Sequence, residues 1–519
     1  MLTDGRSKSP LIAENHARCP TRRKKPTRKG PRIGLVGEQA PQRTSYAEYT
    51  ATIADWCDVA RVTIDMLPGV VLLEVFDFYV NEVEWKQKWL TLVHVCQKWR
   101  TIVFGSPRRL GLRLVCTDGI PVKESLDIWP PLPIVIRHDY YPTLGVDSVI
   151  AALKHNDRVR EIKLGPIPSL QWEEVLATMQ KPFPVLTHLE LGIEDKIQPV
   201  DSLFGGCAPR LQTLSLDRIP FPELPKLLLS TVHLVHLDLW RIPHSGYISP
   251  EVMANSLSVL TRLESLFITF ESPRSHTGCK RQRPSPASLP TRTLVTLPAL
   301  TELYFKGASE YLEDLVAQID TPRLDNLSIT FFHQLIFDTP QLTKFINRAP
   351  KFKAHDEARV FFDDRHVRIT FPQTLDESLE LAISCRQPDW QISSLAQVCS
   401  LSFPQALIPA VKHLYICDGR YSKRLWQGDI ENSQWLELLH PFTGVKSLYL
   451  SREFEPRIAP ALKELVGERV TEVLPALEKL YLEDELHTSG PLQEAIWHFY
   501  YARLFSDHRI VLLRWGRKK

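Results

Sequence analysis

The chain has 519 residues, of which 44% are hydrophobic and 24% are charged, which is close to the composition of ordinary globular proteins and excludes a wholly disordered or fibrous chain. The net charge of +3 excludes a strongly basic nucleic-acid binder on bulk charge alone. The chain has 40 prolines and only 22 glycines. Scarce glycine argues against an enzyme built from several phosphate-cradling loops, and abundant proline predicts many enforced chain breaks.

The N-terminal region is strongly basic. Residues 1–44 carry eleven Lys or Arg against three acids, hence a net charge of +8. The segment 21–30 is polar and lacks periodicity, so residues 1–60 are predicted to be a disordered tail. A solvated tail, a nuclear-import signal and a weak anion-binding arm all remain possible readings of this charge.

Neither the N-terminus nor the cysteines point to export. The start, MLTDGRSKSP, has no apolar core of the kind that a signal peptide needs, and no apolar run approaches the roughly 18 residues of a membrane span. Nine cysteines, an odd number without a C-x-x-C spacing, predict neither a disulfide framework nor a zinc site. A reducing compartment, the cytoplasm or the nucleus, is therefore predicted, without membrane contact.

Two helices are predicted in the first strongly patterned segment. Pro68 suits the first turn of a helix, where its missing N–H costs nothing. One helical face is then marked at i, i+3, i+4 and i+7 by Leu72, Val75, Phe76 and Tyr79. A second helix with the same spacing is marked by Leu92, Val95, Cys96 and Trp99. On periodicity alone this is a small helical hairpin that buries its own core.

The order of residue types in this segment is more specific than its periodicity. Leu67-Pro68 is followed by Leu72-x-x-Val75-Phe76, then by the run Val95 to Arg100, and finally by Pro107 and a leucine-rich exit. This order over about 50 residues resembles an F-box, so residues 61–115 are expected to be a three-helix F-box-like domain.

The resemblance implies a partner. F-box domains dock a Skp-type linker subunit and, through it, a cullin-RING ubiquitin ligase. A unit this small cannot bury all its apolar surface within itself, so part of that surface should remain for docking. Cys96 is expected to be a small hydrophobe and not a nucleophile. By matched position the residues expected to bind the linker are Leu67, Pro68, Leu72, Val75, Phe76, Val95, Cys96 and Trp99.

A second pattern, apolar-x-x-apolar-x-apolar, recurs ten times after residue 150, as in Leu186-x-x-Leu189-x-Leu191. Its early spacing of 23 to 27 residues lies in the range of leucine-rich repeats. Helical stretches such as 169–179 separate the motifs, so each unit is read as a strand plus a helix. The pattern is similar to the irregular leucine-rich tails of many fungal F-box proteins. The alternative is an ordinary α/β domain with leucine-rich strands.

The predicted array spans residues 116–519, and its fold class is α/β. A Ser-, Pro- and Lys/Arg-rich stretch, 271–292, predicts a flexible loop, either a passive insertion or a site of serine phosphorylation. Residues 345–400 interrupt the repeat with two strand-like runs, 359–362 and 367–371. A terminal helix and strand, around 495–504 and 510–513, are predicted to cap the last unit.

The sequence has no P-loop, G-x-G-x-x-G, H-E-x-x-H or G-x-S-x-G motif. The pair His233 and His236 and the acidic pair Asp363-Asp364 are read as strand and turn residues. The chain is thus predicted to be a non-enzymatic F-box substrate-recognition subunit without cofactors, which binds an unknown protein target through its repeats. The alternative is a leucine-rich scaffold outside any ubiquitin ligase, which its basic tail could direct to the nucleus.

Overall fold

The computed structural model describes residues 64–516 except for 82–87, 117–121, 139–145, 166–168, 195–196, 201, 274–293, 354, 373–377, 404–405, 419–429 and 484–489. The chain divides into two compact units, of which the first ends at Val71 and the second begins at Leu72. The predicted tail 1–60 and nearly all of the predicted loop 271–292 lie outside the described residues.

The first described segment is helical. It contains, in order, η1 (Ile64–Met66), α2 (Gly69–Asn81), α3 (Trp89–Val93), α4 (Gln97–Gly105) and the short strand β1 (Leu114–Cys116). The prediction of one continuous second helix was wrong. Cys96 has an extended backbone (φ −158°, ψ 170°) and separates α3 from α4. Arg100 Nε donates to the carbonyl oxygen of Val93 at 3.0 Å, which satisfies one of the acceptors left at the end of α3.

Beyond this segment the second unit is dominated by one long sheet. Its strands are ordered β1-β2-β3-β4-β5-β6-β7-β9-β11-β14-β13-β12-β15-β16-β17-β18 in the described part of the chain. A separate pair joins β8 and β10. The remaining strands are β2 (Ile134–His138), β3 (Val159–Leu164), β4 (His188–Gly192), β5 (Thr213–Asp217), β6 (His236–Ile242), β7 (Ser265–Phe270), β8 (Val295–Thr296), β9 (Glu302–Gly307), β10 (Ile319–Asp320), β11 (Asn326–Phe332), β12 (Glu357–Phe362), β13 (His366–Pro372), β14 (Ser378–Ser384), β15 (His413–Asp418), β16 (Ser447–Leu450), β17 (Lys479–Leu482) and β18 (Val511–Arg514).

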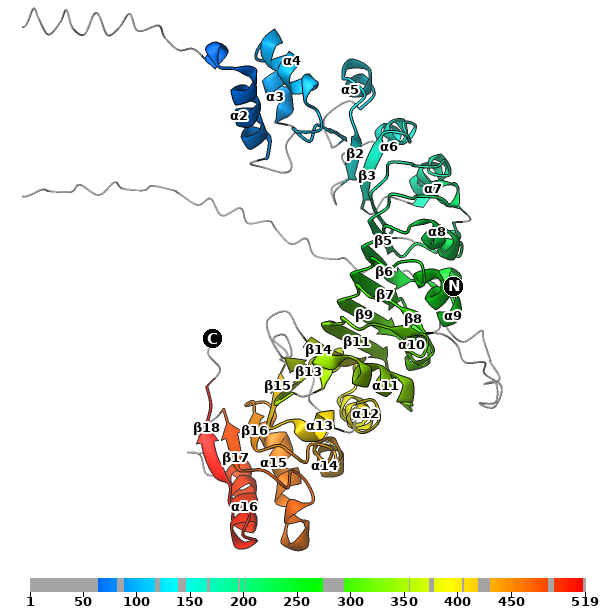
Figure 1. Ribbon diagram of the computed structural model, residues 1–519. Coiled ribbons are helices and arrows are strands. Elements are labelled where there is room, and N and C mark those ends of the chain that lie inside the picture. Colours follow the sequence, from blue (N-terminus) through cyan, green and yellow to red (C-terminus); the bar gives the residue numbers. More distant parts are fainter. Residues whose placement is uncertain are drawn as a thin grey trace, which may run out of the picture. The chain divides into compact units, whose positions relative to one another are not determined.

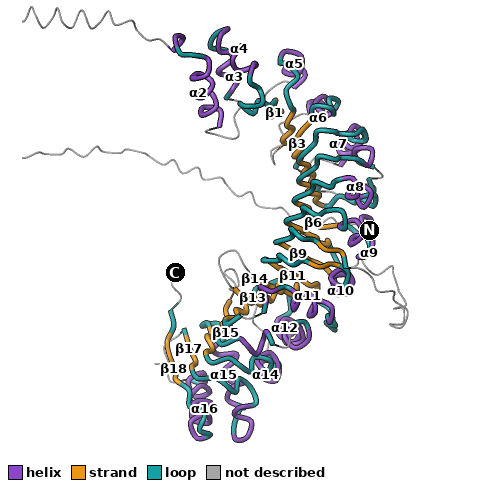
Figure 2. Tube along the Cα trace, viewed as in Figure 1, coloured by secondary structure: helices purple, strands orange, loops and turns teal. Residues whose placement is uncertain are grey.

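Helices run along one face of this sheet, and neighbouring helices such as α8 and α9 or α14 and α15 pack on each other (Figure 1). Figure 2 shows the strands stacked one after another beside the helices. The helices are α5 (Val122–Ile128), α6 (Val146–Leu153), α7 (Ser169–Thr178), α8 (Leu224–Ser230), α9 (Pro250–Leu257), α10 (Ser309–Val316), α11 (Pro340–Arg348), α12 (Pro388–Leu401), α13 (Leu407–Ala410), α14 (Asn432–Leu439), α15 (Glu455–Lys463) and α16 (Pro491–Phe505), with single 3₁₀ turns η2 (Phe204–Gly206), η3 (His244–Gly246), η6 (Pro350–Phe352) and η7 (Gly467–Thr471).

The repeat pattern is confirmed as the core of the sheet. All three apolar positions of each of the ten predicted motifs are at most 3% exposed. In successive strands the motif leucines are paired in register, as Leu189 is with Leu214 and Leu214 with Leu237. Strand-plus-helix units stacked in this way form a leucine-rich-repeat-like α/β array with a mostly parallel sheet.

The excess of proline has a defined place in these units. In the nine motifs from Leu186 onward, the N–H of the first motif residue donates to the carbonyl three residues before it, for example Leu186 to Phe183 at 3.3 Å and Leu477 to Leu474 at 3.1 Å. Pro184 and Pro475 therefore occupy the second position of a four-residue turn, where the fixed φ of proline is already correct. The same turn is formed around Pro209, Pro298 and Pro322.

The interruption predicted at 345–400 lies within the sheet. Both predicted strands are present, as parts of β12 and β13, and β14 was missed. β13 pairs antiparallel with both of its neighbours, whereas β14 pairs parallel with β11 and β12 pairs parallel with β15. The insertion thus keeps the sheet continuous, because its two outer strands offer parallel edges to the repeats on either side.

Candidate functional site

The helical segment has its own aromatic core. Leu72 and Phe76 of α2 are fully buried, as is Val103 of α4. The Phe76 and Trp99 rings lie with centroids 4.7 Å apart at an interplanar angle of 55°, which joins α2 to α4. Trp99 is half-buried, and its indole nitrogen has no hydrogen-bond partner among the described residues. Three of the eight predicted contact residues therefore hold the segment together.

Other predicted contact residues are exposed. Val75 on α2 is 47% exposed and Val95, between α3 and α4, is 53% exposed. Phe78 is 76% exposed and was missed, because it lies outside the apolar spacing that marked the helix. It follows Val75 by three residues, so the two share one side of α2. Val75 and Phe78 form an apolar surface that the segment itself does not cover.

The other residues predicted to contact a partner are Leu67, Pro68 and Cys96. Leu67 and Pro68 belong to the first compact unit, where Leu67 is half-buried and Pro68 is exposed. Cys96 is half-buried at the N-cap of α4 and makes no side-chain capping hydrogen bond. Cys96 therefore lies where α4 begins, directly after the exposed Val95.

An aromatic cluster attaches the helical segment to the repeats. The Trp89 ring packs edge-on to Trp129 at 5.4 Å, and Phe104 lies 6.1 Å from Trp89 and 6.2 Å from Trp129. Trp89 Nε1 donates to the carbonyl oxygen of Arg113 at 3.1 Å. Because β1 also pairs with β2, the end of the helical segment is the first strand of the repeat sheet.

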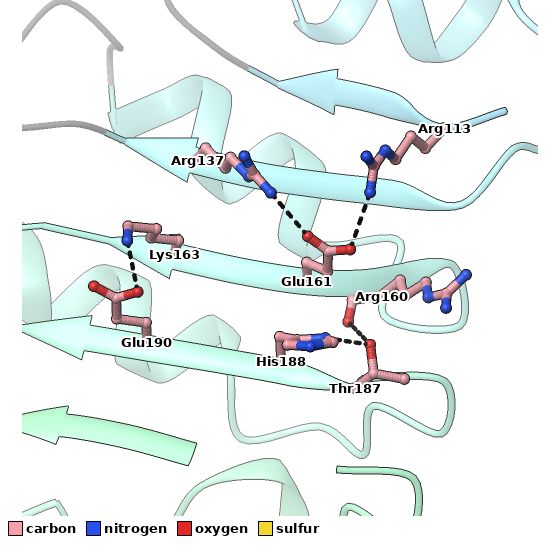
Figure 3. A network of polar contacts seen from close by, with 8 residues as sticks. All are labelled: Arg113, Arg137, Arg160, Glu161, Lys163, Thr187, His188 and Glu190. Atoms are coloured by element: carbon pink, nitrogen blue, oxygen red, sulfur yellow. Dashed lines mark hydrogen bonds and ion pairs between the residues drawn. The ribbon is translucent and has the colours of Figure 1, made fainter. Parts of the chain in front are cut away.

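The sheet face opposite the helices is called the open face below, and its side chains come from the positions between the buried leucines. Near its start the open face is charged (Figure 3). The Glu161 carboxylate lies between Arg113 and Arg137, with each N–O distance 3.3 Å, and Lys163 pairs with Glu190 at 2.8 Å. Cations and carboxylates neutralise each other here, so these side chains leave little net charge to attract a partner.

Further along, the open face becomes aromatic. Trp240, Phe267 and Tyr304 follow one another on β6, β7 and β9, with centroids 5.5 to 5.7 Å apart, and all three are half-buried. Asp238 lies next to these rings, and burial raises the pKa of its carboxyl group. The nearby His236 acts in the opposite direction, because it favours the charged carboxylate. One Asp238 carboxylate oxygen is buried without a hydrogen-bond partner. Half-buried aromatic side chains on an uncovered sheet face form the kind of surface that recognition sites use.

A second aromatic ladder lies on the last strands. Tyr415, Tyr449 and Tyr481 stack in register at 4.1 and 4.2 Å, and Trp515 packs edge-on against the first two. Burial, and the neighbouring Tyr415 and Tyr481, raise the pKa of the Tyr449 hydroxyl. The signal for this ladder was present in the sequence, because each tyrosine occupies the middle position of an apolar-x-apolar strand.

The two polar groups considered for chemistry have structural roles. His236 Nδ1 lies 2.8 Å from Ser265 Oγ on the neighbouring strand. Asp363 Oδ1 accepts the N–H groups of Arg365 at 2.8 Å and His366 at 2.7 Å, which forms the expected turn between β12 and β13. Among the described residues, no three His, Cys, Asp or Glu side chains are grouped so that they could hold a metal ion. The helices described here include none with the length and hydropathy needed to cross a membrane.

Comparison with the sequences of known proteins does not assign this chain to a family. No family model matches the chain, and no curated protein matches it. Among solved structures, the leucine-rich repeat-containing protein LegL7 from Legionella pneumophila is 13% identical, over 75% of this chain and 97% of that chain, with a TM-score of 0.23. A chain of the Rad7 and Elc1 complex in yeast is 12% identical, over 87% of this chain and 97% of that chain, with a TM-score of 0.27.

Proposed function

We propose that this chain is a non-catalytic substrate-recognition subunit of a cullin-RING ubiquitin ligase. Residues 61–115 would dock a Skp-type linker subunit, and the open face of the array at 116–519 would bind the protein to be ubiquitinated. The observation that carries the proposal is the F-box-like residue order in a segment whose Val75 and Val95 are exposed while Leu72 and Phe76 are buried. The cytoplasm or the nucleus is the compartment in which such a ligase would work.

The division between buried and exposed residues supports a docking role. A helical segment needs only its inward apolar residues for its own stability, and those are already provided by Leu72, Phe76 and Val103. Val75, Phe78 and Val95 leave apolar surface in water, and exposed apolar clusters of this kind mark interaction sites.

The test is co-purification of the full-length chain with a Skp-type subunit. Val75→Glu and Val95→Glu should each reduce the recovered subunit about tenfold or more, because a carboxylate buried in an apolar interface is costly. Val252→Glu is the matched control, since Val252 on α9 is exposed to a similar degree. The proposal fails if the unaltered chain recovers no Skp-type subunit, or if all three variants recover it equally.

A second function, a leucine-rich scaffold outside any ligase, is favoured by the aromatic contacts of Trp89 with Trp129. In that case the helical segment covers the first repeat and has no partner of its own. Deleting the segment does not separate the two functions, because the deletion also removes β1 and the cluster around Trp89 from the sheet. The point variants at Val75 and Val95 do separate them, because they leave these contacts in place.

A further inference from the structure

The last strand of the sheet has an open edge. Within the described residues β18 pairs with β17 alone. The N–H of Val511 donates to the carbonyl of Glu478 at 2.9 Å, and that of Trp515 to Leu482 at 3.0 Å. Because alternate residues of a strand direct their N–H groups to opposite sides, the N–H of Leu512 points away from β17.

The terminal helix and strand that were expected to cap the array are present as α16 and β18, and exposed apolar side chains lie along this edge. Val511 is 53% exposed, and Leu513, which is paired with Tyr481, is exposed as well. On α16, Phe505 is 84% exposed and Tyr501 is also exposed. Natural sheet edges and solenoid ends are usually protected by charges, prolines or a polar cap. Among the described residues, this end therefore leaves apolar side chains and a strand edge exposed.

The positive charge beside β18 limits which molecules can bind at its edge. Residues 505–519 contain five Lys or Arg and one acid, and the exposed Arg509 and Arg514 bracket the strand. A second copy of this chain would bring the same cations together across the edge, and the N-terminal tail, at +8 over residues 1–44, would be repelled in the same way. A segment with carboxylates at its ends would be attracted.

We infer that the edge of β18 binds an extended segment of a partner protein that is apolar in its centre and flanked by acidic residues. The segment adds to the sheet as one more strand. Its main-chain groups bond to the outward N–H and C=O of Leu512, and its apolar side chains cover Val511 and Leu513. Its terminal carboxylates lie near Arg509 and Arg514. This site is separate from the helical segment proposed to bind the linker subunit.

The test uses the full-length chain and the fluorescein-labelled peptide Asp-Glu-Val-Thr-Val-Ile-Val-Glu-Asp, with binding followed by fluorescence polarisation. A matched peptide carries Lys in place of every acid. The acidic peptide should bind about tenfold more tightly than the Lys peptide at low salt. The double variant Val511→Thr/Leu513→Thr replaces two apolar side chains by threonine, a residue that strands accept well, and should weaken binding about tenfold. The control Val252→Thr should leave binding unchanged.

Amide hydrogen exchange supplies a readout that does not depend on side chains. Addition of the acidic peptide should protect the amide of Leu512, which faces the open edge. Equal binding of the two peptides, or an amide of Leu512 that stays unprotected at saturation, would overturn the inference. A concentration-dependent dimer seen by analytical ultracentrifugation, and abolished by Val511→Thr/Leu513→Thr, would also overturn it, because the edge would then serve self-association.

Discussion

The ring of Phe76 packs against the indole of Trp99 with centroids 4.7 Å apart, and this contact joins α2 to α4 in the helical segment. Both residues were predicted to bind a linker subunit. Their packing makes them part of the segment's interior, so a variant at Trp99 that loses the linker would not show that Trp99 touches it. Val75 and Val95 do not have this difficulty, because both are exposed.

Replacing Trp99 should therefore destabilise the segment itself. Trp99→Ala removes the ring that covers Phe76, and we expect a loss of about 2–4 kcal/mol in local stability. Amide hydrogen exchange in α4, measured with and without the substitution, reports that loss directly. Val95→Ala, at an exposed position, should change exchange by less than the equivalent of about 0.5 kcal/mol. Unchanged exchange in Trp99→Ala would place the indole in an interface after all.

Arg503 is predicted to be a structural cation. Its side chain is fully buried in α16, and its Nη2 donates to the carbonyl oxygens of Val473 at 3.0 Å and Leu474 at 2.9 Å. Burial lowers the pKa of the guanidinium to about 10, so it stays charged at neutral pH. Arg503→Met removes the guanidinium from the Val473 carbonyl and leaves the Leu474 carbonyl with only the N–H of Leu477, so it should cost about 1–3 kcal/mol of unfolding free energy in urea.

The control for that variant is Arg503→Lys. Lysine retains the charge but cannot reach two carbonyls with a planar fork, so an intermediate loss is expected. If Arg503→Met were as stable as the unaltered chain, the two hydrogen bonds would contribute nothing net.

Glu313 gives a pH-dependent prediction. Its carboxylate accepts the N–H groups of Gln341 at 2.9 Å and Leu342 at 2.7 Å, at the start of α11. Burial raises its pKa, and these two N–H groups oppose that rise without cancelling it. The folded pKa thus lies above the unfolded value, so the stability linked to Glu313 is present below the unfolded pKa and is lost as the pH rises through the folded pKa.

Glu313→Gln does not titrate at this position, so it serves as the reference. The unfolding free energy of the unaltered chain minus that of Glu313→Gln should fall as the pH increases from about 4 to about 7. Urea titrations at several pH values measure this difference. A difference that grows with pH would mean that the N–H groups of α11 outweigh burial.

Two glycines should respond oppositely to alanine. A Cβ at Gly444 would lie 1.9 Å from the carbonyl oxygen of Pro409, and backbone atoms cannot yield cheaply. Gly444→Ala should therefore lower the unfolding free energy by more than about 2 kcal/mol. Gly105, at the end of α4, has open space around its Cβ position.

Gly105→Ala is accordingly expected to be neutral or to stabilise by up to about 1 kcal/mol, because alanine has less freedom in the unfolded chain. Thermal unfolding of both variants measures the contrast. Equal effects of the two substitutions would contradict the close approach of Gly444 to the carbonyl oxygen of Pro409.

Much of the repeat region was predictable from the sequence. Every apolar-x-x-apolar-x-apolar motif, from Val159 to Leu482, lies in the core, because a strand with one covered face must alternate. From Leu186 onward, the turn before each motif also repeats the same hydrogen bond. Proline punctuation was predictable for the same local reason, since the fixed φ of Pro184 or Pro475 suits the turn without help from distant residues. The helix 169–179 was predicted within one residue, as α7.

Other features depended on contacts that a local pattern does not encode. The sequence could not show that Phe76 is buried and Val75 exposed, because both fit the same helical spacing. Only the packing of Trp99 decides which of the two side chains is covered. In the sheet, β11 is followed by β14, β13 and β12, the reverse of their order in the chain. This order depends on which strand pairs with β11, and the strands concerned are dozens of residues apart. The stacking of Tyr415, Tyr449 and Tyr481 likewise needs three distant strands in register.

The sequence by itself thus determined the strands, turns and buried apolar residues of the ten repeat motifs, because these depend on neighbours a few residues away. Tertiary structure alone decided which apolar residues remain in water, at Val75 and Phe78 on α2 and at Val511 and Leu513 on β18. Exposure depends on whether another element is present to cover a side chain, and at both places the described chain provides none. Those uncovered residues are where the proposed partners are expected to bind.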